Sequence, residues 1–376
     1  MKTFALIGAR VFDGTNMLDG MAVIVEGSTI AGVLPASLLL RGIEIEDLKG
    51  GILSAGFIDV QVNGGGGAFM NDNPTVETVK RIAESHRKFG TTGLLPTVIT
   101  DDQKVIDQAM VAVQAAIFNH VPGVLGIHLE GPFIDVARKG VHPANFIRGV
   151  TESDVHHIAA IKCGAVMLTL APNKVPAKFI AELSKRGVLI SLGHAEATAD
   201  EVKQALGAGA RAFTHLFNAM SQLIGREPGM VGACLADRES YCGVIVDGRH
   251  VDDIALKVLF AAKANDRIML ITDAMPPAAG GPESFALQGR IARRVGNGLQ
   301  LDDGTLAGSN LTMDEAVRRC VQLGVSVEDA LRMASSVPAQ FLRRENDLGR
   351  IAEGFVASLV HLSDDLHVKK TWIDGQ

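Results

Sequence analysis

The chain has 376 residues, of which 47% are hydrophobic and 21% charged, which is enough for one large core with a smaller accompanying domain. The formal net charge of −6 argues against nucleic acid or an anionic membrane as a partner. Any bound anion would therefore need a local cluster of cationic or polar groups.

The apolar stretch near the N-terminus, which ends at Arg10, is too short for a signal-peptide core, and no later stretch has the length of a membrane span. The four cysteines form no C-x-x-C pair, so we expect reduced, mostly buried thiols and a cytoplasmic location. These cysteines are Cys163, Cys234, Cys242 and Cys320.

Both ends of the chain are predicted to form short strands. Residues Thr3–Val11, Ala22–Leu34 and Gly354–Trp372 are β-rich, and glycines interrupt or flank them. Neither end has enough strands to be stable alone. We therefore expect both to pair into one small β-sandwich domain, residues 1–53 plus 346–376.

The middle of the chain, residues 54–345, alternates short apolar runs with amphipathic helical stretches. Continuous apolar strands between helices indicate a parallel sheet covered on both faces. Eight such runs favour a closed (β/α)8 barrel, with an open doubly wound sheet as the alternative. The runs are Phe57–Val62, Leu94–Ile99, Val124–Leu129, Val166–Leu170, Val188–Leu192, Ala210–Thr214, Gly243–Val246 and Ile268–Thr272. The clearest helical stretches are Val76–Phe89, Gln103–Asn119, Pro176–Arg186 and Asp252–Ala264.

Polar side chains follow several of these runs, where a barrel places its catalytic groups. Glu130, His194 and His215 each come at the end of a run. One carboxylate and two imidazoles that leave an open position are typical of a hydrolytic metal site. Each residue alone could be a polar group at a strand end. Together they favour a metal centre.

Asp273 follows the last run. A carboxylate there could take a proton from an attacking water and pass it to a leaving amine. The alternative is a carboxylate that only orients a histidine ligand. We favour the acid/base role because amide hydrolysis requires a proton donor for nitrogen.

Nine short motifs are spread over nearly the whole chain. They lie in Gly56–Gly65, His128–Phe133, Gly140–Pro143, Ser191–Ala195, Thr214–Met220, Gly225–Gly229, Asp247–Val251, Thr272–Met275 and Gly304–Ser309. Each motif alone is weakly specific, but their order is highly specific. With these motifs the sequence resembles the amidohydrolase superfamily, and within it the family of N-acetylglucosamine-6-phosphate deacetylases.

The resemblance implies a (β/α)8 barrel with a β domain built from both termini. It implies that Glu130, His194 and His215 bind the metal, that Asp273 is the catalytic acid/base, and that His142 polarises the substrate carbonyl. The implied substrate contacts are Asn218, Ala219, Arg226 and His250, the backbone near Val141, and a lining loop at Leu306, Ala307 and Gly308; we add Gln61 and Asn63 to this set.

One departure from the wider superfamily bears on the number of metal ions. Many members carry His-x-His after the first barrel strand, whereas this chain has Gln61-Val62-Asn63. Neutral amides are poor ligands for a transition metal. We therefore expect one divalent ion per subunit, with Zn²⁺ favoured over Fe²⁺ or another divalent ion.

Several of these residues could bind a phosphosugar. Arg226 offers a two-pronged donor, His250 adds another, and the backbone near Asn218 and Ala219 can face an anion. For Arg226 the alternative is a surface ion pair with Glu227. The resemblance also implies a homodimer in which a neighbouring subunit contributes to the phosphate pocket.

The expected reaction is hydrolysis of N-acetyl-D-glucosamine 6-phosphate to D-glucosamine 6-phosphate and acetate. The first alternative is deacylation of another substrate, such as N-acetylgalactosamine 6-phosphate or an N-acyl amino acid. The second is a scaffold without chemistry, a class that should lack several of the ligands present here.

Overall fold

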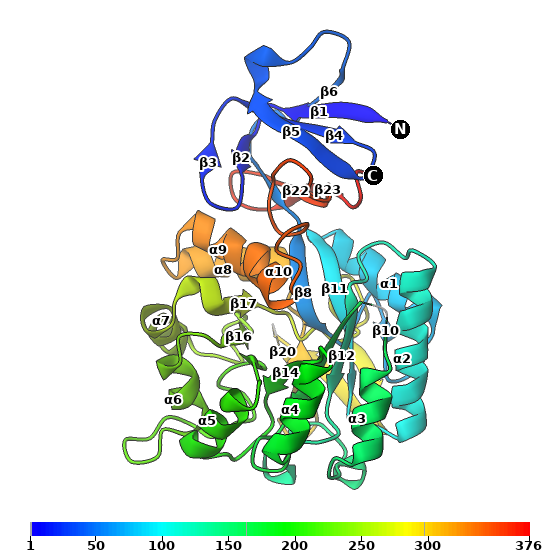
Figure 1. Cartoon of the computed structure of the whole chain (residues 1–376), viewed down its shortest axis with the longest axis vertical. Helices are drawn as coiled ribbons and strands as arrows, with labels where there is room; N and C mark the ends of the chain where they lie inside the picture. Colours follow the sequence, from blue (N-terminus) through cyan, green and yellow to red (C-terminus); the bar gives the residue numbers. More distant parts are fainter. Residues whose placement is uncertain (1, 163, 297) are drawn as a thin grey trace.

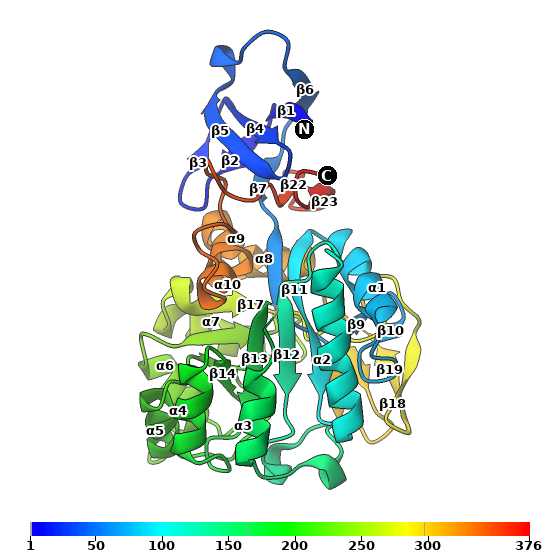
Figure 2. The ribbon, with the colours of Figure 1, turned by 45° about the vertical axis from the view of Figure 1, so that its right-hand side comes forward.

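The structure, a computed structural model, describes residues 2–162, 164–296 and 298–376. Figure 1 shows a barrel surrounded by helices, with strands from both ends of the chain stacked beyond one of its ends. The two views in Figures 1 and 2 agree that this β module lies where the barrel strands begin, away from their carboxyl ends.

The barrel consists of eight parallel strands in sequential order. The barrel closes at a seam between its first and last strands. The segment after the last strand bridges this seam, because the amide of Asp273 donates to Gln61 O (3.0 Å) and the amide of Gly64 donates to Ala274 O (2.8 Å). The structure therefore confirms the predicted (β/α)8 barrel and not the alternative, an open doubly wound sheet. The strands are β8 (Phe57–Val62), β11 (Thr91–Ile99), β12 (Gly126–Glu130), β13 (Ala165–Leu170), β14 (Leu189–Leu192), β15 (Ala212–Phe213), β16 (Tyr241–Val244) and β17 (Ile268–Leu270).

Helices cover the outside of the barrel, and their starts follow local capping chemistry. Thr75, Asp102 and Thr198 each accept a backbone N–H of the first turn with their side chains, which satisfies donors that a helix start leaves free. The four helices expected from periodicity are present within two residues at each end. The helices are α1 (Val76–Arg87), α2 (Gln103–Phe118), α3 (Glu152–Ala159), α4 (Ala177–Lys185), α5 (Ala199–Gly207), α6 (Gly229–Ala236), α7 (Asp253–Ala262), α8 (Met313–Gln322), α9 (Val327–Ala334) and α10 (Ser336–Phe341), with 3-10 turns at Ala36–Leu38, Val136–Arg138, Ala144–Phe146 and Asn265–Arg267.

Between β17 and α8 the chain forms an antiparallel meander that the sequence analysis did not predict. Its strands are β18 (Ser284–Leu287), β19 (Arg290–Val295), β20 (Gly298–Gln300) and β21 (Leu306–Ser309). Apolar side chains of the meander pack with Phe69, Ile99, Val141 and Met275. The meander therefore covers part of the barrel rim. A small hairpin, β9 (Gly64–Gly65) with β10 (Ala68–Phe69), lies beside it.

The β module combines strands from both termini. β22 from the C-terminal end pairs antiparallel with β7, Leu359 opposite Ala55, and a shared core includes Leu6, Leu53 and Trp372. The exact domain boundaries remain a prediction. One sheet holds β1 (Thr3–Ile7), β4 (Met21–Glu26), β5 (Thr29–Pro35) and β6 (Glu44–Asp47); the other holds β2 (Arg10–Phe12), β3 (Met17–Leu18), β7 (Ile52–Ala55), β22 (Leu359–Leu362) and β23 (Val368–Trp372).

Three of the cysteines, Cys234, Cys242 and Cys320, are buried free thiols, as expected, whereas Cys163 lies outside the described residues. Throughout the described ranges, none of the helices combines the length and the apolar character that crossing a bilayer would require.

Candidate metal centre and active site

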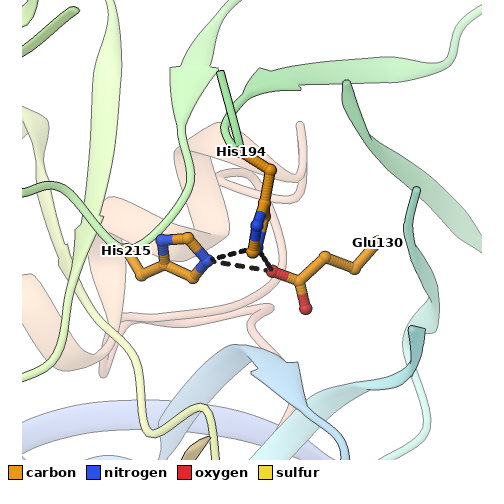
Figure 3. Close-up of side chains that lie close together, drawn as sticks. All are labelled: Glu130, His194 and His215. Carbon is orange, nitrogen blue, oxygen red and sulfur yellow. Dashed lines mark hydrogen bonds and ion pairs between the residues drawn. The ribbon is translucent and has the colours of Figure 1, made fainter. Parts of the chain in front are cut away.

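Three side chains from strands β12, β14 and β15 converge at the carboxyl end of the barrel (Figure 3). Glu130 is the last residue of β12, and His194 and His215 follow β14 and β15. Glu130 Oε1 lies 3.2 Å from His194 Nε2 and 3.0 Å from His215 Nε2, and the two ring nitrogens are 3.0 Å apart. All three residues are buried.

The backbone aims these side chains through unusual turns. His194, His215 and Asp273 have φ angles of 49°, 31° and 51°, in the left-handed region that residues with a side chain seldom adopt. Such backbone strain persists where the surrounding structure enforces it, commonly at functional sites. Here it bends the chain directly after three barrel strands, so the polar groups point into the mouth.

A second contact fixes the orientation of His194. Its Nδ1 lies 2.9 Å from the carbonyl oxygen of Arg138. A carbonyl only accepts, so Nδ1 carries the proton and the lone pair of Nε2 faces Glu130 and His215. This backbone partner is typical of a metal-ligating histidine.

The charge balance of the cluster favours a cation. Burial opposes ionisation of Glu130, but the adjacent imidazoles of His194 and His215 outweigh it and hold the pKa of Glu130 well below its usual value. Burial likewise opposes charge on His215, yet Glu130 raises the pKa of that imidazole.

The donor set fits a single divalent ion. Three ligand atoms about 3 Å apart can share one ion at bond lengths of about 2.0–2.2 Å. Within the described part of the chain, Glu130, His194 and His215 are the group of potential ligands that lie close enough together to hold a metal ion. Imidazole and carboxylate ligands suit zinc or iron.

Asp273 lies beside this cluster and accepts two amide donors. Asn63 Nδ2 is 2.6 Å and Gln61 Nε2 is 3.2 Å from Asp273 Oδ1. Burial, with the negative charge of Glu130, raises the pKa of Asp273 to about 6. A carboxylate with this pKa is suited to accept and return a proton near neutrality.

These groups open into a cavity of about 390 Å³. Most of the residues expected to bind the substrate lie in its wall, together with the metal cluster and Asp273. The expected residues found there are Asn63, Val141, His142, Asn218, Ala219, His250, Leu306 and Gly308.

Three expected substrate contacts lie elsewhere. Gln61 is only 1% exposed and sits behind the wall, where its Nε2 also donates to Glu130 Oε1 (3.0 Å). Residues 306–308 form strand β21, not a loop, so Ala307 points away from the cavity into the meander core. Arg226 is exposed at the tip of a turn and does not line the cavity of its own chain.

Two histidines in the wall are held by neighbours. Asp247 Oδ2 lies 2.7 Å from His250 Nδ1 and orients that ring. His142 Nδ1 lies 2.8 Å from Thr100 Oγ1. Burial lowers the pKa of His142 well below its usual value, and the nearby His194 lowers it further.

Several wall residues were missed by sequence reasoning. Arg138 and Thr305 bring polar groups to the cavity, and Ile99, Ile245 and Met275 bring apolar surface. Arg138 precedes His142 in the loop after β12, so a charged side chain in this loop could have indicated a cavity residue. The apolar residues resemble ordinary barrel core in sequence, and nothing in the sequence marks them as cavity residues.

Comparison with known proteins adds to this geometry. The model of the amidohydrolase family matches residues 52–376, and that of the "NagA composite domain" matches residues 3–53. An N-acetylgalactosamine-6-phosphate deacetylase of Shewanella sp. (strain ANA-3) is 43% identical over 98% of this chain and 94% of that protein. An N-acetylglucosamine-6-phosphate deacetylase of Haemophilus influenzae is 34% identical over 99% of this chain and 98% of that protein.

A solved structure is also similar over its full length. The crystal structure of N-acetylglucosamine-6-phosphate deacetylase from Pasteurella multocida aligns with a TM-score of 0.96 and 33% identity, over 99% of this chain and 98% of that one.

Proposed function

Since the chain belongs to the amidohydrolase family, we propose that it is a metal-dependent deacetylase that converts N-acetyl-D-glucosamine 6-phosphate to D-glucosamine 6-phosphate and acetate. The observation that carries the proposal is the placement of Asp273 beside the Glu130–His194–His215 cluster in one cavity. Full-length similarity to deacetylases of N-acetylated hexosamine phosphates supports it.

In the proposed reaction, Asp273 accepts a proton from the attacking water and later donates it to the leaving amine. Its pKa of about 6 lets it do both near neutral pH. His142 donates a hydrogen bond to the acyl oxygen, where negative charge develops. The wall residues Asn218 and His250 hold the sugar.

One divalent ion, held by Glu130, His194 and His215, would lower the pKa of water and polarise the acyl group. We favour zinc. The side-chain amides of Gln61 and Asn63 direct their N–H groups at Glu130 and Asp273, so they act as hydrogen-bond donors and not as metal ligands. This supports one ion per subunit.

The 6-phosphate pocket is proposed to be completed by a second copy of the chain. Arg226 is exposed and lies next to Leu223 and Ile224, which are 56% and 66% exposed. An exposed arginine beside apolar side chains suits a dimer contact in which Arg226 reaches the partner's cavity.

Subunit mixing tests this arrangement. Arg226→Ala and Asp273→Asn homodimers should each be impaired. After unfolding and co-refolding at equal amounts, roughly a quarter of wild-type activity should return, because half of the dimers then contain one complete site. No recovery above that of the unmixed proteins would contradict a contribution across the interface.

A second candidate substrate is N-acetylgalactosamine 6-phosphate, because a relative that is 43% identical carries that name. The two sugars differ only in the orientation of one hydroxyl group. Comparing kcat/KM for both, under identical metal loading, decides between them.

The central experiment is acetate release by zinc-reconstituted protein from N-acetylglucosamine 6-phosphate, its galactose epimer, unphosphorylated N-acetylglucosamine and an N-acyl amino acid. We expect hydrolysis of the phosphosugars and strong loss without the phosphate. Absence of bound metal and of all turnover would favour a scaffold without chemistry.

The buried reduced thiols further fit the proposed cytoplasmic location.

A further inference from the structure

Thr100 is buried directly after β11, at the rim of the barrel, and it contacts His142 twice. Its backbone N–H donates to His142 Nδ1 at 3.4 Å, and its Oγ1 lies 2.8 Å from the same nitrogen. Both residues are at most 2% exposed.

The backbone contact fixes the chemistry of the ring. An amide N–H can only donate, so Nδ1 must accept, and the imidazole is neutral with its proton on Nε2. Among the residues that the structure describes, none is a hydrogen-bond partner of His142 Nε2, while the ring lines the cavity. The Nε2–H donor is therefore free for a ligand.

Thr100 is itself held from two sides. Gln288, at the turn of the β18–β19 hairpin, donates from Nε2 to Thr100 O at 2.9 Å. Gly131 packs so closely that a Cβ there would lie 2.1 Å from Thr100 Oγ1. The geometry leaves the Thr100 peptide one position, facing the imidazole.

We propose that Thr100 is a positioning residue that holds His142 as the neutral Nε2–H tautomer, aimed at the oxygen of the acyl group. The part of this inference that concerns catalysis rests on the proposed function, whereas the part that concerns the tautomer does not.

The matched variants are Thr100→Val, which removes the hydroxyl at nearly constant volume, and Thr100→Ser, which keeps it. Thr91→Val is the control, because Thr91 is a buried residue at the start of β11 whose Oγ1 has no hydrogen-bond partner among the described residues. Melting curves of all three show whether the fold is retained.

Two-bond proton–nitrogen NMR spectra of the zinc-loaded protein, labelled with ¹⁵N-histidine, report the tautomer directly. His142 is assigned from its loss in His142→Asn. We expect the Nε2–H pattern in wild type, Thr100→Ser and Thr91→Val, where both contacts to Nδ1 remain. In Thr100→Val the 2.8 Å hydroxyl contact is lost and only the longer backbone contact of 3.4 Å is left, so we expect a mixture of tautomers. An Nδ1–H pattern in wild type overturns the proposal.

Kinetics test the link to catalysis. Thr100→Val should lower kcat by about ten- to a hundredfold with KM within about twofold, and Thr100→Ser should restore kcat. In a His142→Asn background, Thr100→Val should cause no further loss; an equal loss there would show that Thr100 does not act through His142. If wild type turns over no hexosamine phosphate, the proposed function fails while the NMR result still decides the tautomer.

Discussion

Asn63 donates a 2.6 Å hydrogen bond from Nδ2 to Oδ1 of Asp273, across the seam that closes the barrel. This bond favours the charged form of the carboxylate, whereas burial raises its pKa to about 6. The proton affinity of the proposed acid/base group thus reflects burial, which raises it, and the hydrogen bond from Asn63, which lowers it.

Replacing Asn63 with Ala should therefore shift the pH profile. Without the donor, the charged form of Asp273 is less favoured and its pKa rises. The acidic limb of kcat/KM should move to higher pH, by roughly half a unit to one unit. The control is Asn119→Ala, at an exposed helix end, which should leave the profile in place; a shift to lower pH in Asn63→Ala would contradict the assignment.

Asp273→Asn tests the proton-transfer role itself. The amide keeps the size of the side chain but cannot accept and return a proton. We expect turnover to fall to background, at least about a thousandfold, while metal content measured by elemental analysis stays at the wild-type level. Substantial residual turnover in fully metal-loaded protein would rule out Asp273 as the base.

Metal binding should stabilise the fold with a stoichiometry of one. A ligand that binds only the native state adds about 2.7 kcal/mol when its free concentration is a hundredfold above Kd. Titration of chelator-treated protein with zinc should thus raise Tm and saturate at one equivalent per chain. Glu130→Gln should abolish the rise, since its amide cannot replace the carboxylate between His194 and His215. Saturation at two equivalents would refute the single-ion site.

The sequence predicted the barrel and the main polar groups because both depend on local order along the chain. Glu130, His194, His215 and Asp273 each stand at the end of an apolar run, and parallel strands bring such ends to one mouth. Convergence within 3.2 Å could not be predicted, because it depends on left-handed turns at residues that carry side chains.

The differences between the expected and the observed positions have equally local causes. Alternation along a strand separates Leu306 and Gly308 from Ala307, but this is visible only once β21 is known to be a strand. Gln61 belongs to the polar layer behind the cavity wall, where its amide donates hydrogen bonds to two carboxylates. Thr100 looks like any strand-end threonine, and only its distance to His142 distinguishes it.

Asp59 offers a test of the seam that is independent of catalysis. It is fully buried in β8, and Thr272 Oγ1 donates to its Oδ2 at 2.6 Å. Burial raises the pKa of Asp59 to about 7 despite hydrogen bonds from Thr272 and Gln61. In an unfolded chain the same group titrates near a pKa of about 3.9, so the folded state keeps the proton to higher pH.

The sign of the stability effect follows from this difference. Between about pH 4 and pH 7 the folded protein binds more protons at Asp59 than the unfolded chain does, so the free energy of unfolding falls as the pH rises. The loss is on the order of 1.4 kcal/mol for each unit by which the pKa is raised, and it is complete above about pH 7. Below pH 4 both states are protonated and the contribution is constant.

Asp59→Asn should remove this pH dependence. An amide can keep the acceptor for the backbone N–H groups of Gln61 and Thr272 and donate to the hydroxyl of Thr272, while carrying no charge at any pH. Urea unfolding at pH 5 and pH 8 should show a smaller decrease in stability for the variant than for wild type, by a few kcal/mol. The control Asp19→Asn removes the same charge at an exposed position and should follow wild type. Equal decreases in Asp59→Asn and wild type would mean that Asp59 is ionised in the folded protein throughout this range.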